Sequence, residues 1–472
     1  MISYKIIFKN ILSLSVSELI GRMLNFVSFA LLARIILPDG FGIINFAFSF
    51  ASYFLLVVNF GFDTTGTREI AQSRCDPSEY VSKLISLRLL LAVAGYFFLI
   101  TVIYFVKIPS LVKTAVSIYG LSLFTNALLI NWFYKGIEKT LPISIAQIVS
   151  ALANLLGIIF FVHLSHDLLT AVWIVVFSSF LNAVILLAQF YKSKYKLSLR
   201  IDKIFFYETV RNSSPIGLSY FLIGIYYNLD QVMLGFMSSQ SDLGYYSAAY
   251  KIFYIVIIPA SIILNAFFPQ MSRFSNDFEK LSQLLGTYSK LMFIAGFFIC
   301  FFGLLNAETI IHLIFGGEYF SSVLLLKLLF INTVLVFINM TYGNPLLAWN
   351  RNRQYLTAIA LGAVINVVLN FILIPAYKST GAAAATICSE AVVFGGVFYY
   401  YRKYTGVIHF PLLAKVFMSG LISYILAAVF DSQKYFGLLN GFIFTVLFIL
   451  FLILSKVISF RNFKSILQIY EG

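Results

Sequence analysis

Charged residues are scarce in this sequence. Only 11% of the 472 residues are Asp, Glu, Lys or Arg, whereas 60% are hydrophobic, and the mean hydropathy is +0.92. A soluble domain carries charge on roughly a quarter of its residues, so the composition excludes one. A transmembrane helix needs about 20 predominantly apolar residues, and runs of that length fill nearly the whole chain. The composition therefore predicts a membrane protein.

Cysteine, histidine and nucleotide-binding motifs are also scarce. Cys75, Cys300 and Cys388 have no paired spacing, and the 4 histidines have no metal-ligand spacing, so neither a disulfide framework nor a metal site is expected. No P-loop sequence occurs, and we therefore expect no ATP hydrolysis on this chain. The net charge of +14 comes from basic residues in short gaps between apolar segments. That placement indicates membrane topology rather than nucleic-acid binding.

Apolar runs and their breakers predict an all-α polytopic membrane protein with about 14 transmembrane helices. No β-strand alternation recurs, and only helices and closed barrels satisfy their backbone polar groups in lipid. The first apolar run is too long for a signal peptide and lacks a cleavage site, so it is expected to remain as a helix. The expected spans are 11–37, 41–62, 82–106, 114–134, 141–163, 168–190, 213–237, 244–269, 286–306, 321–346, 355–376, 380–400, 412–430 and 437–455.

Lysine and arginine gather in alternate loops between these spans. The opposite loops hold only Lys107, Lys113, Lys378 and Lys434. Because cytoplasmic loops are enriched in lysine and arginine, the bias predicts cytoplasmic N- and C-termini. The basic loop "NRNR" (350–353) is then cytoplasmic. Its expected role is topology, and steering of an anionic headgroup is an additional hypothesis.

The two groups of six spans resemble each other weakly. "FGIINFAF" (41–48) pairs with "LGYYSAAY" (243–250), and "GIEKTLPISIAQIVSALAN" (136–154) pairs with "AWNRNRQYLTAIALGAVIN" (348–366). Both halves begin on the same side of the membrane, so the repeats are parallel, and such bundles commonly rock to give alternating access. The predicted divisions are an N-terminal six-helix bundle, a cytoplasmic basic linker, a C-terminal six-helix bundle, and two extra transmembrane helices with a basic tail, at 1–190, 191–212, 213–403 and 404–472.

Several charged residues fall at membrane depth. Such a charge costs about 2.5–3.5 kcal/mol on insertion scales, so each is a functional candidate by default. In the first span, Ser15, Glu18, Arg22 and Asn25 share one helical face, and Glu18 and Arg22 have the i, i+4 spacing of an ion pair. Two hypotheses stay open: a structural pair that neutralises itself, or an arginine that lines a cavity and meets an anionic headgroup.

The second half carries three further candidates. Asp230 lies deep in "YYNLDQVMLGF", and Lys251 lies one to two turns into the following span. For both, contact with a ligand or ion and mutual neutralisation are open alternatives. Glu390, in "TICSEAVVFGG", has no obvious partner, and a packing role is favoured for it.

Other polar residues in the spans have simpler interpretations. Arg34, Arg88 and Lys327 lie near span ends, where long side chains are expected to reach water. The polar stripe in the eleventh span is expected to pack against a neighbouring helix, because small residues allow close approach and amides bond between helices. That stripe consists of Gly362, Asn366 and Asn370.

Three stretches resemble a known family. "LLARIILPDGFGIINFAFSFASYF" (31–54) looks like the first helical hairpin of polysaccharide flippases, and residues 230–274 resemble the start of their second half. Residues 343–390 carry, in order, a glycine, a short basic loop, paired asparagines, "IP" and "GAA-A-T--SE". The sequence is similar to O-antigen and related repeat-unit flippases of the Wzx type. Their superfamily also holds multidrug and toxin extrusion proteins and lipid II flippases. One departure is "ILPDG", where the family usually has a glycine after "RI-".

The resemblance implies translocation of an undecaprenyl-pyrophosphate-linked oligosaccharide from the cytoplasmic to the outer leaflet of the bacterial inner membrane. It implies no enzymatic step and no cofactor, with H⁺ or Na⁺ as the coupling ion. The expected partners are this lipid-linked substrate, membrane lipids, and a polysaccharide polymerase with its chain-length regulator, but not nucleic acid. Arg22, Lys251 and Asn25 are the predicted headgroup contacts, and Glu18, Asp230 and Glu390 are the predicted ion-coupling residues.

Three rival functions fit the sequence less well. A cation-coupled multidrug exporter of the same fold would favour an acidic cavity, whereas the charges within these spans are mixed and slightly basic. A membrane glycosyltransferase or polymerase needs a sizeable loop outside the membrane, and the longest outer loop is only 306–320. A scaffold role would not explain charges at membrane depth.

Overall fold

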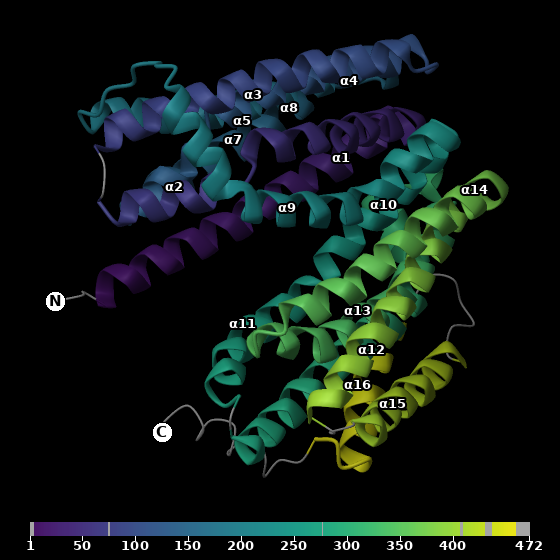
Figure 1. Cartoon of the computed structure of the whole chain (residues 1–472). Helices are drawn as coiled ribbons and strands as arrows, with labels where there is room; N and C mark the ends of the chain where they lie inside the picture. Colours follow the sequence, from purple (N-terminus) through teal and green to yellow (C-terminus); the bar gives the residue numbers. More distant parts are fainter. Residues whose placement is uncertain (1–3, 74–75, 276, 406–408, 430–436, 459–472) are drawn as a thin grey trace. The chain divides into compact units, whose positions relative to one another are not determined.

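The computed structural model of the protein describes residues 4–73, 76–275, 277–405, 409–429 and 437–458 (Figure 1). Across these residues the secondary structure is helical, and no strand occurs. Ten helical stretches in this part of the chain are long and apolar enough to cross a membrane. The predicted all-α polytopic class is therefore confirmed, and the protein is a multi-pass membrane protein.

The chain folds into two compact units, residues 1–244 and 245–472. Unit 1 is built from α1 (Tyr4–Asn59), α2 (Phe62–Ala71), α3 (Pro77–Phe105), α4 (Ser110–Gly120), α5 (Ser122–Ala127), α6 (Asn131–Gly136), α7 (Leu141–Phe161), η1 (Ser165–Asp167), α8 (Leu168–Lys192), α9 (Lys203–Met237) and the start of α10 (Gln240–Val256). Unit 2 continues with α11 (Ile258–Arg273), α12 (Phe278–Ile314), η2 (Gly317–Tyr319), α13 (Ser322–Ala348), α14 (Asn352–Thr405), α15 (Phe410–Val429) and α16 (Gly437–Leu454). These two units are defined by how their residues pack. The predicted boundary at 191–212 separates two repeats instead, and it stays a prediction.

Two helices are long because each contains a kink. α1 leaves helical geometry at Leu37 (φ 63°, ψ 172°), directly before Pro38. A proline has no N–H and disfavours the helical conformation of the residue before it. α14 is kinked at Lys378 (φ 53°, ψ −131°). The kinks fall at the predicted breaks between spans, whereas the single span expected at 114–134 is interrupted between α4, α5 and α6.

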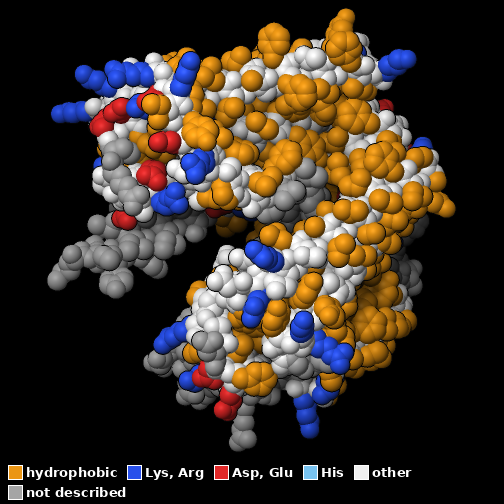
Figure 2. Space-filling model, viewed as in Figure 1, with side chains coloured by type: hydrophobic (Ala, Val, Ile, Leu, Met, Phe, Trp, Pro, Cys, Tyr) orange, Lys and Arg blue, Asp and Glu red, His pale blue; other side chains and the backbone are white. Residues whose placement is uncertain are grey.

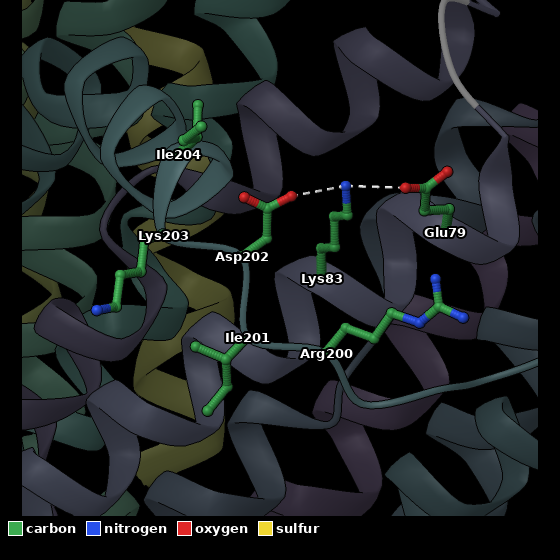
Figure 3. Close-up of a pocket in the computed structure, with 7 residues that line it drawn as sticks. All are labelled: Glu79, Lys83, Arg200, Ile201, Asp202, Lys203 and Ile204. Atoms are coloured by element: carbon green, nitrogen blue, oxygen red, sulfur yellow. Dashed lines mark ion pairs between the residues drawn. The ribbon is translucent and has the colours of Figure 1, made fainter.

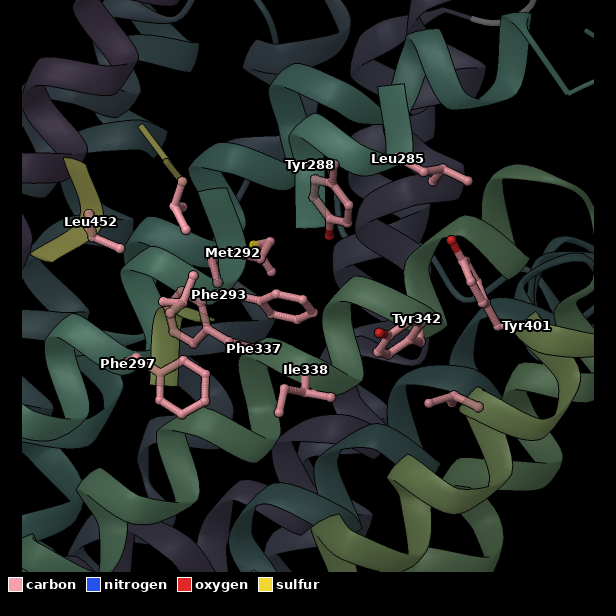
Figure 4. Close-up of a cluster of buried hydrophobic side chains, with 14 of the residues drawn as sticks. Leu285, Tyr288, Met292, Phe293, Phe297, Phe337, Ile338, Tyr342, Tyr401 and Leu452 are labelled. Carbon is pink, nitrogen blue, oxygen red and sulfur yellow. The ribbon is translucent and has the colours of Figure 1, made fainter. Parts of the chain in front are cut away.

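Each unit has an aromatic core. In unit 1, Phe133 packs edge-on against Phe190, with ring centroids 5.1 Å apart. In unit 2, the buried cluster of Figure 4 includes Tyr288, whose hydroxyl donates to the carbonyl of Met340 at 3.0 Å. Aromatic side chains bury about 150–250 Å² each. The hydroxyl needs an acceptor when it is buried, and the α13 backbone supplies one.

The surface of both units is strongly apolar. Phe97 is 74% exposed, Phe105 is 78% exposed and Phe160 is 65% exposed. Figure 2 shows hydrophobic side chains over most of the visible face of each unit, with lysine and arginine mainly toward one end. A soluble protein rarely exposes such area, whereas a membrane protein presents it to lipid.

Two glycines that the repeat aligns make a close helix contact within unit 1. A Cβ on Gly42 of α1 would lie 1.8 Å from the carbonyl oxygen of Gln240, and a Cβ on Gly244 of α10 would lie 2.0 Å from that of Pro38. The hydroxyl of Ser241 donates to Asp39, 202 residues away. Shifting 38, 39 and 42 by this offset gives 240, 241 and 244, so the contact has approximate two-fold character. This pattern supports the repeat.

Candidate functional site

The first polar site lies on α1. Arg22 Nη2 donates to Glu18 Oε1 at 2.6 Å, and the two side chains are 62% and 55% exposed. Asn25, about one turn further along, is exposed as well. On another face of the helix, the buried Ser17 hydroxyl donates to Ser144 of α7 at 2.9 Å. The predicted i, i+4 pairing is confirmed, and the pair lies on an exposed face of α1.

The exposed polar face of α1 requires polar surroundings. An ion pair and an amide on a membrane-spanning helix require water, a polar ligand or other polar groups around them. Arg22 keeps donors that Glu18 does not use, because a guanidinium presents five N–H groups. The arrangement can therefore bind an anion without first breaking the ion pair. The side chain of Ser15, predicted to share this face, lies outside the described residues.

Asp230 lies deep in unit 1. The residue, on α9, is only 4% exposed. The neighbouring Gln231 accepts a hydrogen bond from the Ser49 hydroxyl of α1 at 3.0 Å. A polar contact between α1 and α9 is thus made by the residue next to Asp230 in sequence, and sequence reasoning missed Ser49.

Arg88 is the clearest correction to the sequence interpretation. It was expected to reach water at a span end, but its side chain is 1% exposed. Its guanidinium donates to Asp63 Oδ1 at 3.2 Å, to the Leu129 carbonyl at 3.0 Å and to the Asn126 carbonyl at 2.8 Å. It also donates to the Asn59 side chain. The two carbonyls lie where α5 ends before α6, so the arginine bonds backbone acceptors at the break between these helices.

Unit 2 holds the other two predicted site residues. Lys251 of α10 is half-buried. Glu390 of α14 has a partner, contrary to expectation: Asn339 of α13 donates through Nδ2 to its carboxylate at 2.5 Å and to its backbone carbonyl at 3.0 Å. The partner is 51 residues away, so sequence spacing gave no signal. Asp230 and Lys251, whose mutual neutralisation stays a hypothesis, belong to different units.

The polar stripe of α14 packs as predicted. A Cβ on Gly362 would lie 2.2 Å from Val393 Cγ2, so the two arms of α14 approach closely there. Asn370 Nδ2 donates to Asn366 Oδ1 at 3.1 Å, and both residues are buried. These contacts give the stripe a structural role.

The "NRNR" loop borders a pocket of about 450 Å³ in unit 2. The loop begins with a helix-ending turn, in which Asn350 is left-handed (φ 61°) and the Arg351 N–H donates to the Leu346 carbonyl at 2.8 Å. The guanidinium of Arg351 then stacks 4.5 Å from the ring centroid of Tyr404. Trp349 and Tyr404 both line the pocket. Aromatic faces beside a guanidinium and an amide suit a sugar or a phosphate, and steering of a headgroup by this loop stays a prediction.

In the described part of the chain, no group of three or more His, Cys, Asp or Glu side chains is placed to hold a metal ion.

The fold is the one shared by lipid II flippases and multidrug transporters. The lipid II flippase MurJ, in an inward closed conformation, superposes with a TM-score of 0.73 at 15% identity, over 94% of this chain and 99% of that one. A multidrug resistance MATE family transporter in an inward-facing conformation gives a TM-score of 0.65 at 13% identity, over 84% and 99%. These likenesses show the fold of the chain, a polytopic helical bundle.

Residues 7–275 match the family described as polysaccharide biosynthesis protein, and the chain belongs to that family. Residues 215–372 also match the MatE family. The chain is 25% identical over 402 residues to the putative O-antigen transporter of Escherichia coli (82% of this chain, 94% of that one). It is 23% identical over 412 residues to the capsular polysaccharide biosynthesis protein CapF of Staphylococcus aureus (84% and 99%). A probable low-salt glycan biosynthesis flippase, Agl15 of Haloferax volcanii, is 29% identical over 175 residues (36% of each chain). The resemblance predicted from the sequence is confirmed.

Proposed function

We propose that this protein is a flippase that carries a lipid-linked oligosaccharide repeat unit from the cytoplasmic to the outer leaflet by alternating access. The observation that carries the proposal is the family match over 7–275, together with the near full-length relative described as an O-antigen transporter. The polar face of α1 agrees with it. A pyrophosphate and sugars cross hydrocarbon only where protein groups replace their water.

The predicted site residues take specific roles in this proposal. Arg22 binds the pyrophosphate, because a guanidinium matches phosphate geometry and stays charged. Asn25 lies beside it on the exposed face of α1, and Lys251 supplies a second cation from α10. Glu18, Asp230 and Glu390 couple transport to a proton or sodium ion. The undecaprenyl tail of the substrate stays in lipid throughout.

The finer topology is part of the same proposal. In this proposal the protein lies in the bacterial inner membrane, with fourteen transmembrane helices and both termini in the cytoplasm. A basic linker at 191–212 joins two six-helix bundles at 1–190 and 213–403, and 404–472 adds two helices and a tail. The polysaccharide polymerase and its chain-length regulator act on the product. The chain itself catalyses no bond formation.

A second candidate is a cation-coupled multidrug exporter. The match of residues 215–372 to the MatE family and the buried carboxylate of Asp230 favour it. The polysaccharide family match is longer, and the relatives that align over most of this chain carry polysaccharide names. We therefore rank the flippase first.

The experiment is complementation of a deletion strain. Lipid-linked repeat units should accumulate on the cytoplasmic side without the protein, and the wild type should clear them. A normally expressed Arg22→Ala variant should not clear them. Clearance by both proteins would keep the flippase and discard Arg22 as a headgroup contact. Altered drug sensitivity without accumulation would instead identify the exporter.

A further inference from the structure

The segment between α8 and α9 is docked along α3. The backbone N–H groups of Lys196, Ser198 and Arg200 donate to the hydroxyls of Ser78, Ser82 and Ser86, at 3.2, 2.9 and 3.0 Å. Two residues of extended chain advance by about 6.6 Å, and four residues of helix advance by about 6 Å. The two periods match, so alternate residues of the segment meet successive turns of the helix. We call residues 194–204 the strap.

An ion-pair bridge fixes the end of the strap. Lys83 Nζ lies 2.8 Å from Glu79 Oε1 and 2.8 Å from Asp202 Oδ2 (Figure 3). Asp202 also caps α9, because its carboxylate accepts from the Phe205 N–H at 3.0 Å. The bond to Lys83 holds the pKa of the Asp202 carboxyl below its usual value. The strap therefore has a fixed place on unit 1.

The strap alternates apolar and basic side chains. Tyr195 and Leu197 are partly buried against the aromatic core of unit 1, and the Tyr195 ring stacks 5.0 Å from Phe190. The apolar series then continues beyond the core, where Leu199 is 62% exposed and Ile201 is 69% exposed. The first turn of α9 adds Ile204 at 74% exposed.

The basic series occupies the alternate positions. Lys194, Lys196 and Arg200 are exposed, and so is Lys203 at the start of α9. A pocket of about 450 Å³ lies at this end of the strap, and its lining holds three cations, two carboxylates and two isoleucines: Lys83, Arg200, Lys203, Glu79, Asp202, Ile201 and Ile204. Two carboxylates neutralise Lys83, whereas no ion pair within the described ranges uses the side chains of Arg200 or Lys203.

We propose that the strap binds anionic phospholipid of the inner leaflet, with Lys196, Arg200 and Lys203 on the headgroup phosphates and Leu199, Ile201 and Ile204 at the acyl boundary. The proposal uses the cytoplasmic placement of this segment from the proposed topology, but not the flippase activity. Exposed aliphatic side chains interleaved with cations are what an interfacial anchor requires. A soluble anion would leave the aliphatic side chains in water, and a lipid covers both series.

Native mass spectrometry on the purified full-length protein tests this directly. The probes are phosphatidylglycerol and phosphatidylcholine with the same acyl chains, and sn-glycerol 3-phosphate is the soluble competitor. The test variant is Lys196→Gln/Arg200→Gln/Lys203→Gln, which keeps the backbone bonds to the serines. The matched control, Arg402→Gln/Lys403→Gln/Lys415→Gln, removes the same charge from exposed positions of unit 2. Melting temperature in phosphatidylcholine micelles checks that each variant is folded.

Each cation beside an anionic surface contributes a factor of about five in affinity, so the strap variant should bind phosphatidylglycerol about a hundredfold more weakly than wild type. The control should stay within about twofold of wild type, because surface charges elsewhere contribute little to a local site. Equal phosphatidylglycerol affinity in the strap variant and the wild type would overturn the proposal, as would an equal loss in the control.

A second variant keeps the proposal testable if the first is unstable. Leu199→Ser/Ile201→Ser leaves every strap cation in place, and we expect it to bind phosphatidylglycerol more weakly while its affinity for glycerol phosphate is unchanged. Displacement of phosphatidylglycerol from the wild type by equimolar glycerol phosphate would mark a soluble-anion site and contradict the lipid assignment. Because no arm measures transport, failure here would leave the flippase proposal standing.

Discussion

Glu138 and Asn350, 212 residues apart in the sequence, end their helices in the same left-handed conformation, with φ of 58° and 61°. The hydrogen bonds correspond as well. The Lys139 N–H donates to the Tyr134 carbonyl at 2.9 Å, as the Arg351 N–H donates to the Leu346 carbonyl at 2.8 Å. This is the Schellman way of ending a helix. The predicted repeat aligns these two positions, and the shared turn supports that alignment.

The shared turn predicts that two glycine substitutions change the stability of the protein by different amounts. Glutamate at a left-handed position is strained, whereas asparagine tolerates it, so Glu138→Gly should stabilise the protein by about 1 kcal/mol. Asn350→Gly should change stability by only a few tenths of a kcal/mol. Thermal unfolding of the purified variants in detergent measures both. Destabilisation by Glu138→Gly would show that the glutamate side chain outweighs the backbone strain.

The close contact of α1 and α10 predicts intolerance of a single methyl group. Gly42→Ala and Gly244→Ala would each place a Cβ within 2.0 Å of a backbone carbonyl oxygen, and such overpacking typically costs about 1–3 kcal/mol. Gly395→Ala is the matched control, because a Cβ there meets nothing within 4 Å. Melting temperatures should fall for the first two variants and not for the control. Unchanged values for all three would mean that the helices separate readily at this contact.

Arg88 and Asp63 predict unequal effects although they form one ion pair. Arg88→Met removes donors from two partly buried backbone carbonyls and a side-chain amide, so it should destabilise unit 1 by roughly 1–3 kcal/mol. Asp63 is 54% exposed, but Asp63→Asn leaves the buried guanidinium charge without its carboxylate partner, so it should cost more, about 3–5 kcal/mol. Expression level and melting temperature distinguish the two variants. A loss confined to Arg88→Met would place the importance of Arg88 in its backbone hydrogen bonds instead of in the ion pair.

Local sequence relationships predicted the structure better than distant ones. The Glu18–Arg22 pair and the Gly362 stripe follow from helical periodicity, and the structure contains both. The kink at Leu37 follows from the proline after it. Long apolar runs also predicted the all-helical class, because a helix that crosses lipid needs such a run.

The features that the sequence did not predict depend on chain segments that meet only in the fold. The hydrogen-bond partners of Arg88 are Asn59, Asp63, Asn126 and Leu129. The sequence around Arg88 contains no pattern that indicates them. Glu390 finds Asn339 in the same way. The serines of α3 have a readable spacing of four residues, but their acceptor role required the extended strap lying beside them.

A substitution of Glu390 tests the coupling of transport to protons without a change in the fold. Glu390→Gln keeps an acceptor for the Asn339 amide and removes the carboxylate charge, so stability should shift by no more than about 1 kcal/mol. If Glu390 couples transport to protons, the variant should lose the stimulation that a pH gradient gives the wild type in proteoliposomes. Asn339→Ala is a companion variant that breaks the contact but keeps the carboxylate. Full stimulation of Glu390→Gln would remove this residue from the coupling set.

The central claim is tested most directly by transbilayer movement of a purified undecaprenyl-pyrophosphate oligosaccharide in proteoliposomes. The wild type should accelerate its appearance in the opposite leaflet, and Arg22→Ala should slow that rate by about tenfold or more, because losing a charge-assisted phosphate contact costs about 1.5–3 kcal/mol. The melting temperature of this variant should stay near that of the wild type, since Arg22 and Glu18 are exposed and such pairs add little stability. No acceleration by folded wild-type protein, under any imposed ion gradient, would contradict the account.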